Sequence, residues 1–214
     1  MGLRSRWWST FFGVPRGPIG WVGARIMRKS NPTFYRAVAA ELDLQPDDEL
    51  LDVGCGSAGM LVEPGAPLRY VAGLDASEIQ LGMARERLAE RIAAGTAEIV
   101  EGDAMALPWD DERFSVVTSI NAMKFFPEPA GALREMYRVL RFGGRLAITM
   151  GEAEYAPAGS TEAVVDGFGQ WQWSDVSARR ALDEAGFSDI ETSVMPVFSK
   201  ALLVRGTKPD GKRG

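Results

Sequence analysis

The residues that could do chemistry begin with a carboxylate beside a group of glycines. Asp52 lies near the end of the apolar run Leu50–Val53, and Gly54, Gly56 and Gly59 follow at once. Glycine permits positive φ and has no Cβ, so the backbone of such a turn can lie directly against a ligand. A charge at the mouth of a buried strand needs a cationic or hydroxylated partner. This stretch therefore predicts a nucleotide-like cofactor held by the turn.

Two further acids stand where a second and a third strand should end. Asp75 follows the apolar run Tyr70–Leu74, a position that suits hydrogen bonds from the hydroxyls of an adenosine ribose. Asp103 follows the strand expected at Ala97–Val100. Local roles are the alternatives, because Asp75 could cap the next helix and Asp103 could be a turn residue. Taken alone, the glycine spacing and Asp75 fit NAD as well as a methyl donor.

The absence of histidine removes several kinds of chemistry. The 214-residue chain has no His and a single cysteine, Cys55. Ser-His-Asp and Cys-His catalysis cannot be built, nor can the usual zinc and non-haem iron sites. One cysteine also excludes an intrachain disulfide. We expect no metal, since no tight carboxylate cluster stands out, and proton transfer would use Asp, Glu, Tyr, Lys or water.

The order of elements predicts a sheet that brings these acids together. Five apolar or β-branched runs alternate with helical segments, and a short link forces the last two strands into an antiparallel pair. The expected fold class is α/β: a doubly wound, mostly parallel seven-stranded sheet with a C-terminal antiparallel hairpin and helices on both faces. Ligands bind such sheets at the carboxyl ends of the strands. The expected strands are 50–53, 70–74, 97–100, 114–120, 145–150, 190–197 and 200–205, and the main helices are 33–44, 77–91, 129–140 and 175–185.

Five blocks of sequence distinguish the two cofactors. In this order they resemble the class I methyltransferases that use S-adenosylmethionine, and the resemblance runs from about Leu44 to Thr207. The order of the blocks is far more specific than the glycines alone. The blocks are LDVGCGSAG (51–59), GLDAS (73–77), EGDAMALPW (101–109), FSVV (114–117) and VLRFGGRL (139–146).

The resemblance implies cofactor-binding residues from four turns. The turn after the first strand would hold the methionine end, the second turn would bind the ribose, and the third would contact the adenine. A residue just past the fourth strand would lie near the methionine portion. The implied residues are Asp52, Gly54, Cys55 and Gly56 in the first turn, Asp75, Ala76 and Ser77 in the second, Gly102, Asp103, Ala104 and Met105 in the third, and Asn121.

Two features depart from the family pattern. The third glycine, expected six places after Asp52, is Ala58, and a glycine stands instead at Gly59. The helix that follows should be short, because Pro64 and Pro67 stop it within about two turns. Both features affect the contacts of the cofactor and leave the binding function in place.

The sequence does not identify a catalytic group. Methyl transfer from a sulfonium is an in-line displacement with a neutral leaving group, so positioning and desolvation can supply most of the acceleration. A base is needed only if the acceptor must lose a proton. Packing or surface roles are the commoner use of the side chains in question. The candidates by position are Tyr35, Asn121, Glu152 and Tyr155, with Lys124 and Glu154 as further possibilities.

The segments that could face an acceptor favour a small apolar molecule. Residues 1–36, 121–127 and 151–173 are rich in Trp, Phe, Met and Tyr, which suits an aromatic or heteroaromatic, natural-product-like acceptor. No Asn-Pro-Pro-Tyr motif follows the fourth strand, which argues against amino methyltransferases of adenine or glutamine. The net charge of −5 argues against nucleic acid. The sequence leaves two alternatives to a methyltransferase. One is an NAD-binding oxidoreductase, and the other is an S-adenosylmethionine binder or cyclase that does not methylate.

The domain organisation places one main domain between two smaller segments. We expect residues 1–32 to form a basic aromatic lid segment that could also join a homodimer, and residues 33–207 to form the methyltransferase domain. Within it, residues 151–173 would be a substrate-cap loop, and residues 208–214 a flexible tail. The sequence has no run of 18 apolar residues and no secretory signal, so we expect a cytoplasmic protein with no membrane contact.

Overall fold

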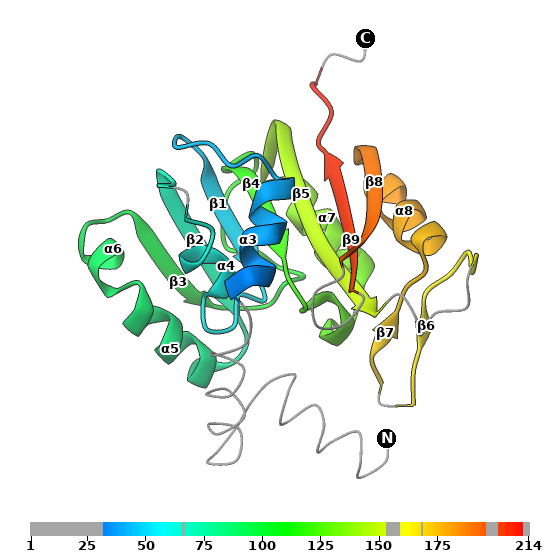
Figure 1. Ribbon diagram of the computed structural model, residues 1–214, viewed down its shortest axis with the longest axis horizontal. Coiled ribbons are helices and arrows are strands. Elements are labelled where there is room, and N and C mark those ends of the chain that lie inside the picture. The colour runs from blue at the N-terminus through cyan, green and yellow to red at the C-terminus, as the bar shows by residue number, and fades with distance from the viewer. Residues whose placement is uncertain (1–31, 66, 153–158, 168, 196–200, 212–214) are drawn as a thin grey trace.

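The computed structural model describes residues 32–65, 67–152, 159–167, 169–195 and 201–211. Its main sheet has seven strands in the order β3-β2-β1-β4-β5-β9-β8, seen edge to edge in Figure 1. The expected α/β fold class is confirmed. The strands are β1 (Glu49–Val53), β2 (Tyr70–Asp75), β3 (Ala97–Glu101), β4 (Phe114–Ser119), β5 (Leu140–Glu152), β8 (Ser188–Met195) and β9 (Ala201–Thr207).

The strand order reverses at β1. This strand pairs in parallel with β2 on one side and with β4 on the other, and β3 and β5 extend the parallel sheet outward. The last two strands, β8 and β9, are antiparallel, as expected. A crevice at the carboxyl ends of β1 and β4 is therefore the place where this topology favours a ligand.

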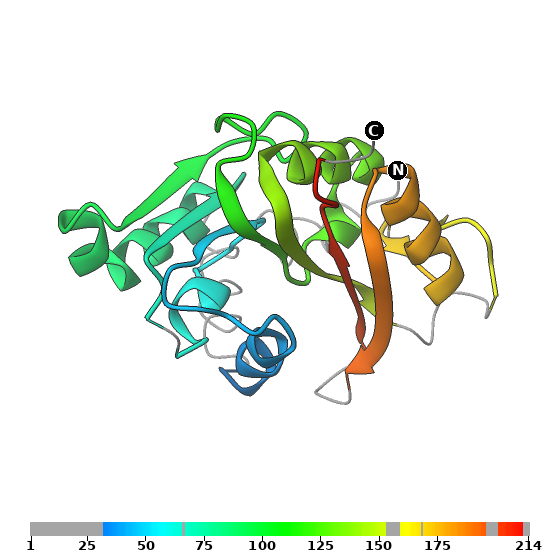
Figure 2. The same ribbon diagram turned by 90° about the horizontal axis from the view of Figure 1, so that it is seen from above.

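Helices cover both faces of the sheet (Figure 2). Alternate residues along a strand point to opposite faces, and adjacent β1 residues accordingly join different cores, Leu50 one and Leu51 the other. The core that contains Leu50 is covered by α3 (Pro32–Glu41), α4 (Gly59–Val62) and α5 (Glu78–Arg87), and the core that contains Leu51 by α7 (Pro129–Val139) and α8 (Asp175–Glu184).

Two elements differ from the sequence prediction near their ends. The helix expected over residues 77–91 is broken at Leu88, where φ is −105° and ψ is 12°, into α5 and α6 (Ala89–Ala93). The fifth strand begins at Leu140, ahead of the glycine pair in which a turn was expected. Gly143 has a φ of +71°, a left-handed conformation that glycine allows. The strand continues through it, and the pairing of β4 with β5 shifts register at this point.

The region expected to be a pattern-poor cap loop contains a small hairpin. Strand β6 (Val164–Val165) pairs with β7 (Trp171–Gln172) in antiparallel fashion. The side chain of Asp166 closes the turn, because its Oδ1 accepts a hydrogen bond from the Gln170 backbone N–H at 2.9 Å. A two-residue strand leaves too little alternation to be recognised in sequence.

Lys208, where a flexible tail was expected to start, is packed against the domain. Lys208 is buried, and its Nζ donates hydrogen bonds to the carbonyl oxygens of Leu140 at 2.8 Å and Tyr137 at 3.0 Å. These carbonyls lie at the C-terminal end of α7, where a cation is favourable. Lys208 therefore belongs to the packed domain.

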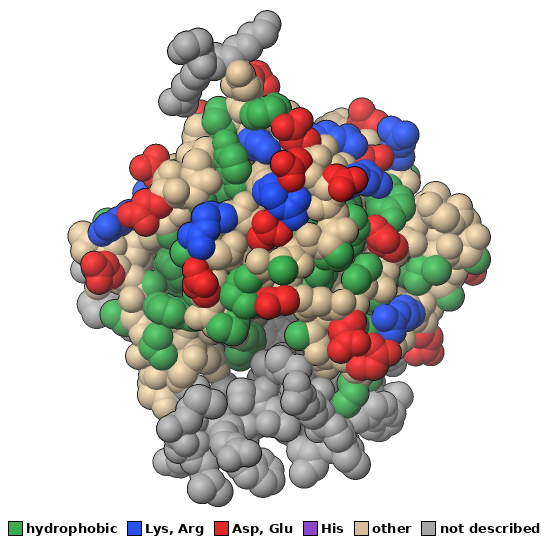
Figure 3. Space-filling model, turned by 180° about the vertical axis from the view of Figure 1, so that it is seen from behind, with side chains coloured by type: hydrophobic (Ala, Val, Ile, Leu, Met, Phe, Trp, Pro, Cys, Tyr) green, Lys and Arg blue, Asp and Glu red, His purple; other side chains and the backbone are tan. Residues whose placement is uncertain are grey.

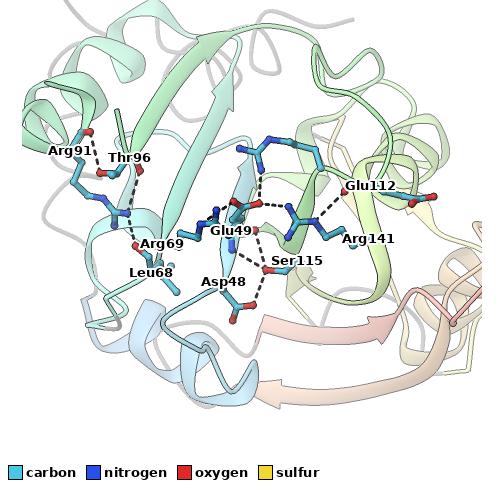
Figure 4. A network of polar contacts seen from close by, with 10 residues as sticks. Asp48, Glu49, Leu68, Arg69, Arg91, Thr96, Glu112, Ser115 and Arg141 are labelled. Carbon is cyan, nitrogen blue, oxygen red and sulfur yellow. Dashed lines mark hydrogen bonds and ion pairs between the residues drawn. The ribbon is translucent and has the colours of Figure 1, made fainter. Parts of the chain in front are cut away.

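A partly buried ion network holds the sheet at the end opposite the crevice (Figure 4). The Glu49 side chain, 8% exposed, is paired with Arg113 at 2.6 Å and with Arg141. Beside it, Asp48 accepts a hydrogen bond from Ser115 Oγ at 2.7 Å. These residues belong to β1, β4, β5 and the segments just before them, so the network ties the amino ends of the central strands together.

The outer surface carries mixed charge. On the face shown in Figure 3, acidic and basic side chains are interspersed rather than gathered into separate areas. Among the residues that the structure describes, none of the helices combines the length and the apolar character needed to cross a bilayer.

Candidate cofactor and acceptor site

A cavity of about 610 Å³ opens at the carboxyl ends of β1 to β4. It lies at the reversal of strand order, where the topology favours a ligand. Most of the residues expected to bind a cofactor lie in its wall. These are Asp52, Gly54, Cys55, Gly56, Asp75, Ala76, Gly102, Asp103, Ala104, Met105 and Asn121.

The glycine turn is tied to the end of β2. The backbone N–H groups of Gly54 and Cys55 both donate to the carbonyl of Leu74, at 2.7 and 3.0 Å. Gly54 and Gly56 have φ values of +75° and +51°, which is left-handed backbone that favours glycine. The turn is therefore fixed by its own backbone, with its glycines facing the cavity.

The displaced third glycine has a steric explanation. Ala58 takes the left-handed conformation usually reserved for glycine, with φ 62° and ψ 37°. At Gly59, a Cβ would lie only 2.3 Å from the Tyr35 ring. Because the Tyr35 ring of α3 occupies that space, the position next to Ala58 must be glycine, and α3 packs directly on the cofactor turn.

Asp52 is a buried acid without a cationic partner among the described residues. It is 2% exposed, and its Oδ1 accepts a hydrogen bond from Thr118 Oγ1 at 2.7 Å. Burial, reinforced by the nearby charge of Asp75, raises the pKa of Asp52 to about 7, despite the hydrogen bond from Thr118. An approaching ammonium group would stabilise the ionised form of this side chain.

Asp75 presents a carboxylate that is already oriented by backbone donors. Its Oδ2 accepts from the Gly56 N–H and its Oδ1 from the Ser77 N–H, each at 2.9 Å. Burial raises the pKa of Asp75. Ser77 itself is buried behind the carboxylate and does not line the cavity. Each carboxylate oxygen has lone-pair capacity left for a ligand hydroxyl.

The third and fourth turns complete the wall. Asp103 is exposed and its Oδ1 accepts the Met105 N–H at 3.0 Å, so it has the turn role considered from sequence and also faces the cavity. Asn121 has a φ of +59°, held by its N–H, which donates to Thr149 Oγ1 at 2.6 Å. Asparagine adopts left-handed backbone more readily than most residues, and here it places Asn121 in the cavity wall.

Of the candidate catalytic residues, Tyr35 and Asn121 line the cavity, and the others have no described place in its wall. Tyr35 lines the cavity, and burial together with the charge of Asp52 raises its pKa to about 12. Glu152 is placed only by its backbone pairing with Ala201, and Tyr155 lies outside the described residues, as does Glu154. Lys124 is not in the cavity wall, and its Nζ lies 5.3 Å from the centre of the Phe125 ring.

Several wall residues were not predicted from the sequence. Phe125 and Phe126 belong to the segment 121–127, which was expected to face an acceptor, and both line the cavity. Gln80 was missed entirely, although it lies on the buried face of α5. A polar residue on an otherwise apolar helix face was the available signal. Ala122 and Pro127 also come from the segment 121–127, and the remaining additions are Ser57, Leu74, Glu101 and Ile120.

The cavity is suited to an organic cofactor that carries both polar and apolar groups. Within the described ranges, no group of three or more Cys, Asp or Glu side chains is placed to hold a metal ion. Asp52 suits an ammonium group, Asp75 suits hydroxyls, and Met105 with the phenylalanines suits a flat ring. Gln80 adds a polar amide to the same wall, and its Oε1 has no hydrogen-bond partner among the described residues.

Comparison with known sequences identifies the same region. The methyltransferase domain family matches residues 51–148, which run from β1 to β5 and include most of the cavity wall. A demethylmenaquinone methyltransferase of Listeria monocytogenes is 40% identical over 107 residues, 49% of this chain and 45% of that protein. Cycloartenol-C-24-methyltransferase 1 of rice, Oryza sativa, is 34% identical over 123 residues, 57% of this chain and 36% of that protein. The chain thus spans less than half the length of these curated relatives.

Solved structures share the fold at lower sequence identity. Phosphoethanolamine N-methyltransferase 2 of Haemonchus contortus, solved with S-adenosyl-L-methionine, has a TM-score of 0.73 and 15% identity, covering 98% of this chain and 61% of that one. The cyclase SpnF has a TM-score of 0.66 and 20% identity, covering 92% and 85%. The expected resemblance in fold and domain is confirmed.

Proposed function

We propose that this chain, whose residues 51–148 match the methyltransferase domain family, uses S-adenosylmethionine to methylate an apolar, aromatic or heteroaromatic small molecule. The observation that carries the proposal is the single cavity wall in which a glycine turn, the buried Asp52, the half-buried Asp75 and aromatic rings meet. No individual motif has that specificity.

The residues of the cavity fit each part of the cofactor. Asp52 would pair with the ammonium of the methionine end, and Asp75 would accept hydrogen bonds from the ribose hydroxyls. The turn from Gly102 to Met105 would enclose the adenine. Asn121, held in its strained backbone conformation, would lie near the methionine end.

The acceptor is inferred from the rest of the wall. Phe125, Phe126 and Ile120 face the cavity, and Trp171 of the hairpin donates from Nε1 to the Phe126 carbonyl at 3.0 Å. The aromatic segment is therefore fastened from outside and can form a firm apolar surface. The names of the two curated relatives, which refer to a menaquinone precursor and a sterol, agree with an apolar acceptor.

Methyl transfer requires the protein mainly to position the acceptor against the methyl group. Bound S-adenosylmethionine supplies an electrophilic methyl group on a sulfonium. The apolar wall would exclude water and align the acceptor for in-line attack. With a pKa of about 12, Tyr35 keeps its proton at neutral pH, so it can donate a hydrogen bond and position groups but is a poor base. A proton lost by the acceptor would pass to water or to another group.

Calorimetry with S-adenosylhomocysteine and NAD tests the cofactor. We expect binding of the first ligand only, and a loss of about 100-fold or more in Asp75→Ala, because hydrogen bonds to a charged group contribute roughly 1.5–3 kcal/mol each. Circular dichroism of the variant checks that it is folded. Binding of NAD alone would make the chain an oxidoreductase instead.

Transfer of labelled methyl groups tests the acceptor. The panel would contain a naphthoquinol, a sterol, an indole and a short RNA. Label in an apolar ring compound supports the proposal, and label in the RNA contradicts it. Cofactor binding without transfer to any apolar compound would favour a binder or cyclase that does not methylate. The lid, homodimer and substrate-cap roles of residues 1–32 and 151–173 stay predictions.

A further inference from the structure

Arg87, at the end of α5, contacts the glycine turn of residues 54–58 from outside the cavity. Its Nη1 donates a hydrogen bond to the Ser57 carbonyl at 2.8 Å, and its Nη2 is paired with Glu63 Oε1, also at 2.8 Å. The Arg87 side chain is 17% exposed and does not line the cavity, whereas Ser57 does. A mostly buried cation therefore holds a backbone group of the cavity wall.

The helix that follows the turn is too short to fix it. Helix α4 has only four residues, and a single helical turn gains too few hydrogen bonds to be stable by itself. Ala58, at its N-cap, has left-handed backbone and makes no side-chain capping bond, and Glu63 is its C-cap. Since Ser57 directly precedes Ala58, the two acceptors of Arg87 stand one at each end of α4.

We propose that Arg87 is a positioning residue for the cofactor, acting through the Ser57 carbonyl. This inference rests on the proposed cofactor, S-adenosylmethionine. The guanidinium is a planar, rigid fork, so one group can hold both ends of α4 in a fixed relation. With Ser57 held, the neighbouring Gly56 N–H stays on Asp75 Oδ2, and the turn keeps the shape that faces the cavity. Arg87 thus supplies the support that a four-residue helix does not give.

The ion pair with Glu63 alone explains Arg87 less well. Glu63 already has a second cation, because Arg36 Nη2 of α3 lies 3.7 Å from its Oε2. Exposed ion pairs contribute little to stability, and Arg85 makes such a pair with Glu78 from the same helix as Arg87. Arg87 differs from Arg85 in being mostly buried and in donating to a carbonyl of the turn.

Calorimetry with S-adenosylhomocysteine compares Arg87→Met with the parent protein at a temperature far below the melting transition. We expect the dissociation constant of the variant to be higher by roughly 5- to 30-fold, because binding must then also order the turn. If Arg87 acted only on stability, its loss would lower the melting temperature and leave the dissociation constant unchanged, since both proteins are folded during the titration. The dissociation constant therefore separates positioning from stabilisation.

Hydrogen exchange of the ligand-free protein gives a second readout. The backbone N–H groups of Gly54, Cys55 and Gly56 donate hydrogen bonds to the end of β2, so their exchange requires the turn to open. We expect residues 54–58 to exchange faster in Arg87→Met than in the parent, and the strands of the sheet to exchange as before.

Arg85→Met and Glu63→Gln are the matched controls. Arg85→Met removes the same charge from the same helix, and the pair that it breaks is the one with Glu78. Glu63→Gln removes the charge of the ion pair and leaves the bond from Arg87 to the Ser57 carbonyl in place. Both variants should bind S-adenosylhomocysteine within about twofold of the parent, with unchanged exchange of residues 54–58.

The outcomes distinguish this proposal from the proposed cofactor. An unchanged dissociation constant in Arg87→Met would overturn the positioning role, and an equal loss of affinity in either control would assign the effect to charge or to the ion pair instead. If the parent protein fails to bind S-adenosylhomocysteine at all, the proposed cofactor is wrong, which is a different result. The exchange of residues 54–58 then still decides whether Arg87 holds the turn.

Discussion

The affinity of the site for S-adenosylhomocysteine should rise with pH, because Asp52 must ionise to receive an ammonium group. Asp52 is 2% exposed, and burial raises its pKa to about 7. Below that pH the empty site holds a neutral acid. Pairing with the ligand's ammonium favours the carboxylate, so binding at lower pH must release the proton of Asp52.

The size of the effect follows from the pKa. Each pH unit below 7 adds about 1.4 kcal/mol to the cost of ionising Asp52, which is a factor of ten in affinity. Between pH 5 and pH 7 the cost changes by about 2.3 kcal/mol, or roughly 50-fold, because half of the Asp52 side chains are still protonated at pH 7. The ligand's amino group stays protonated over this range, so its own titration does not contribute. Above pH 8 this contribution should vanish.

Titration calorimetry at pH 5, 6 and 7 checks this reasoning. Repeating each titration in two buffers of different ionisation enthalpy counts the protons released, which should approach one per site at pH 5 and about one half at pH 7. In Asp52→Asn the pH dependence should largely disappear, leaving only what Asp75 contributes through its own raised pKa. A parent affinity that is flat from pH 5 to pH 7 would refute the argument, and an unchanged slope in Asp52→Asn would assign it to another group.

The same pKa has the opposite sign for the stability of the empty protein. A carboxyl group with a raised native pKa stabilises the fold at low pH, and this contribution is lost as pH rises from about 4 to about 7. The full loss is about 4 kcal/mol. Asp52→Asn should therefore resist urea better than the parent at pH 8, with the difference shrinking toward pH 4. A variant that is less stable at pH 8 would contradict the assigned cause, burial.

Three further predictions concern packing and charge. Gly59→Ala should cost about 1–3 kcal/mol of unfolding free energy, because its Cβ would meet the Tyr35 ring at 2.3 Å; urea titration should show a smaller cost in a Tyr35→Ala background. Glu49→Gln should cost about 2–3 kcal/mol in the same assay, less than for a fully buried pair because Arg113 and Arg141 are 33% and 42% exposed. Lys208→Met should lower the free energy of unfolding by about 1–2 kcal/mol, because its hydrogen bonds to the carbonyl groups at the end of α7 are lost. An unchanged melting curve would show that these hydrogen bonds do not stabilise the fold.

The parts of the site that sequence predicts well are those determined locally. Asp52, Asp75 and Asp103 each follow an apolar run, and parallel strands necessarily bring their carboxyl ends to one edge. The alternation of strands and helices fixes the sheet for the same reason. Short-range pattern therefore sufficed for the turns and for most of the cofactor wall.

The parts that sequence does not predict depend on distant neighbours. Gly59 is required by Tyr35, 24 positions earlier in the chain, and no local rule connects the two. Lys208 is buried because the carbonyl groups at the end of α7 need donors. Gln80 interrupts an apolar helix face for a reason that only the cavity reveals. In each case the residue satisfies a tertiary contact rather than a local preference.

Three residues of the cavity wall have features that are unfavourable in the empty protein. Asp52 is a buried acid without a described cation, Gln80 has an unpaired buried oxygen, and Asn121 has a left-handed backbone. Each of these features destabilises the empty protein, and all three residues line one cavity. Single irregularities also occur outside the cavity, among them the unpaired Oε1 of Gln172 and the positive φ of Glu112, so the buried acid Asp52 beside the glycine turn is the stronger sign of a ligand. An ammonium group, as in the proposed cofactor, would compensate for the burial of Asp52, and a diol would use the free lone pairs of Asp75.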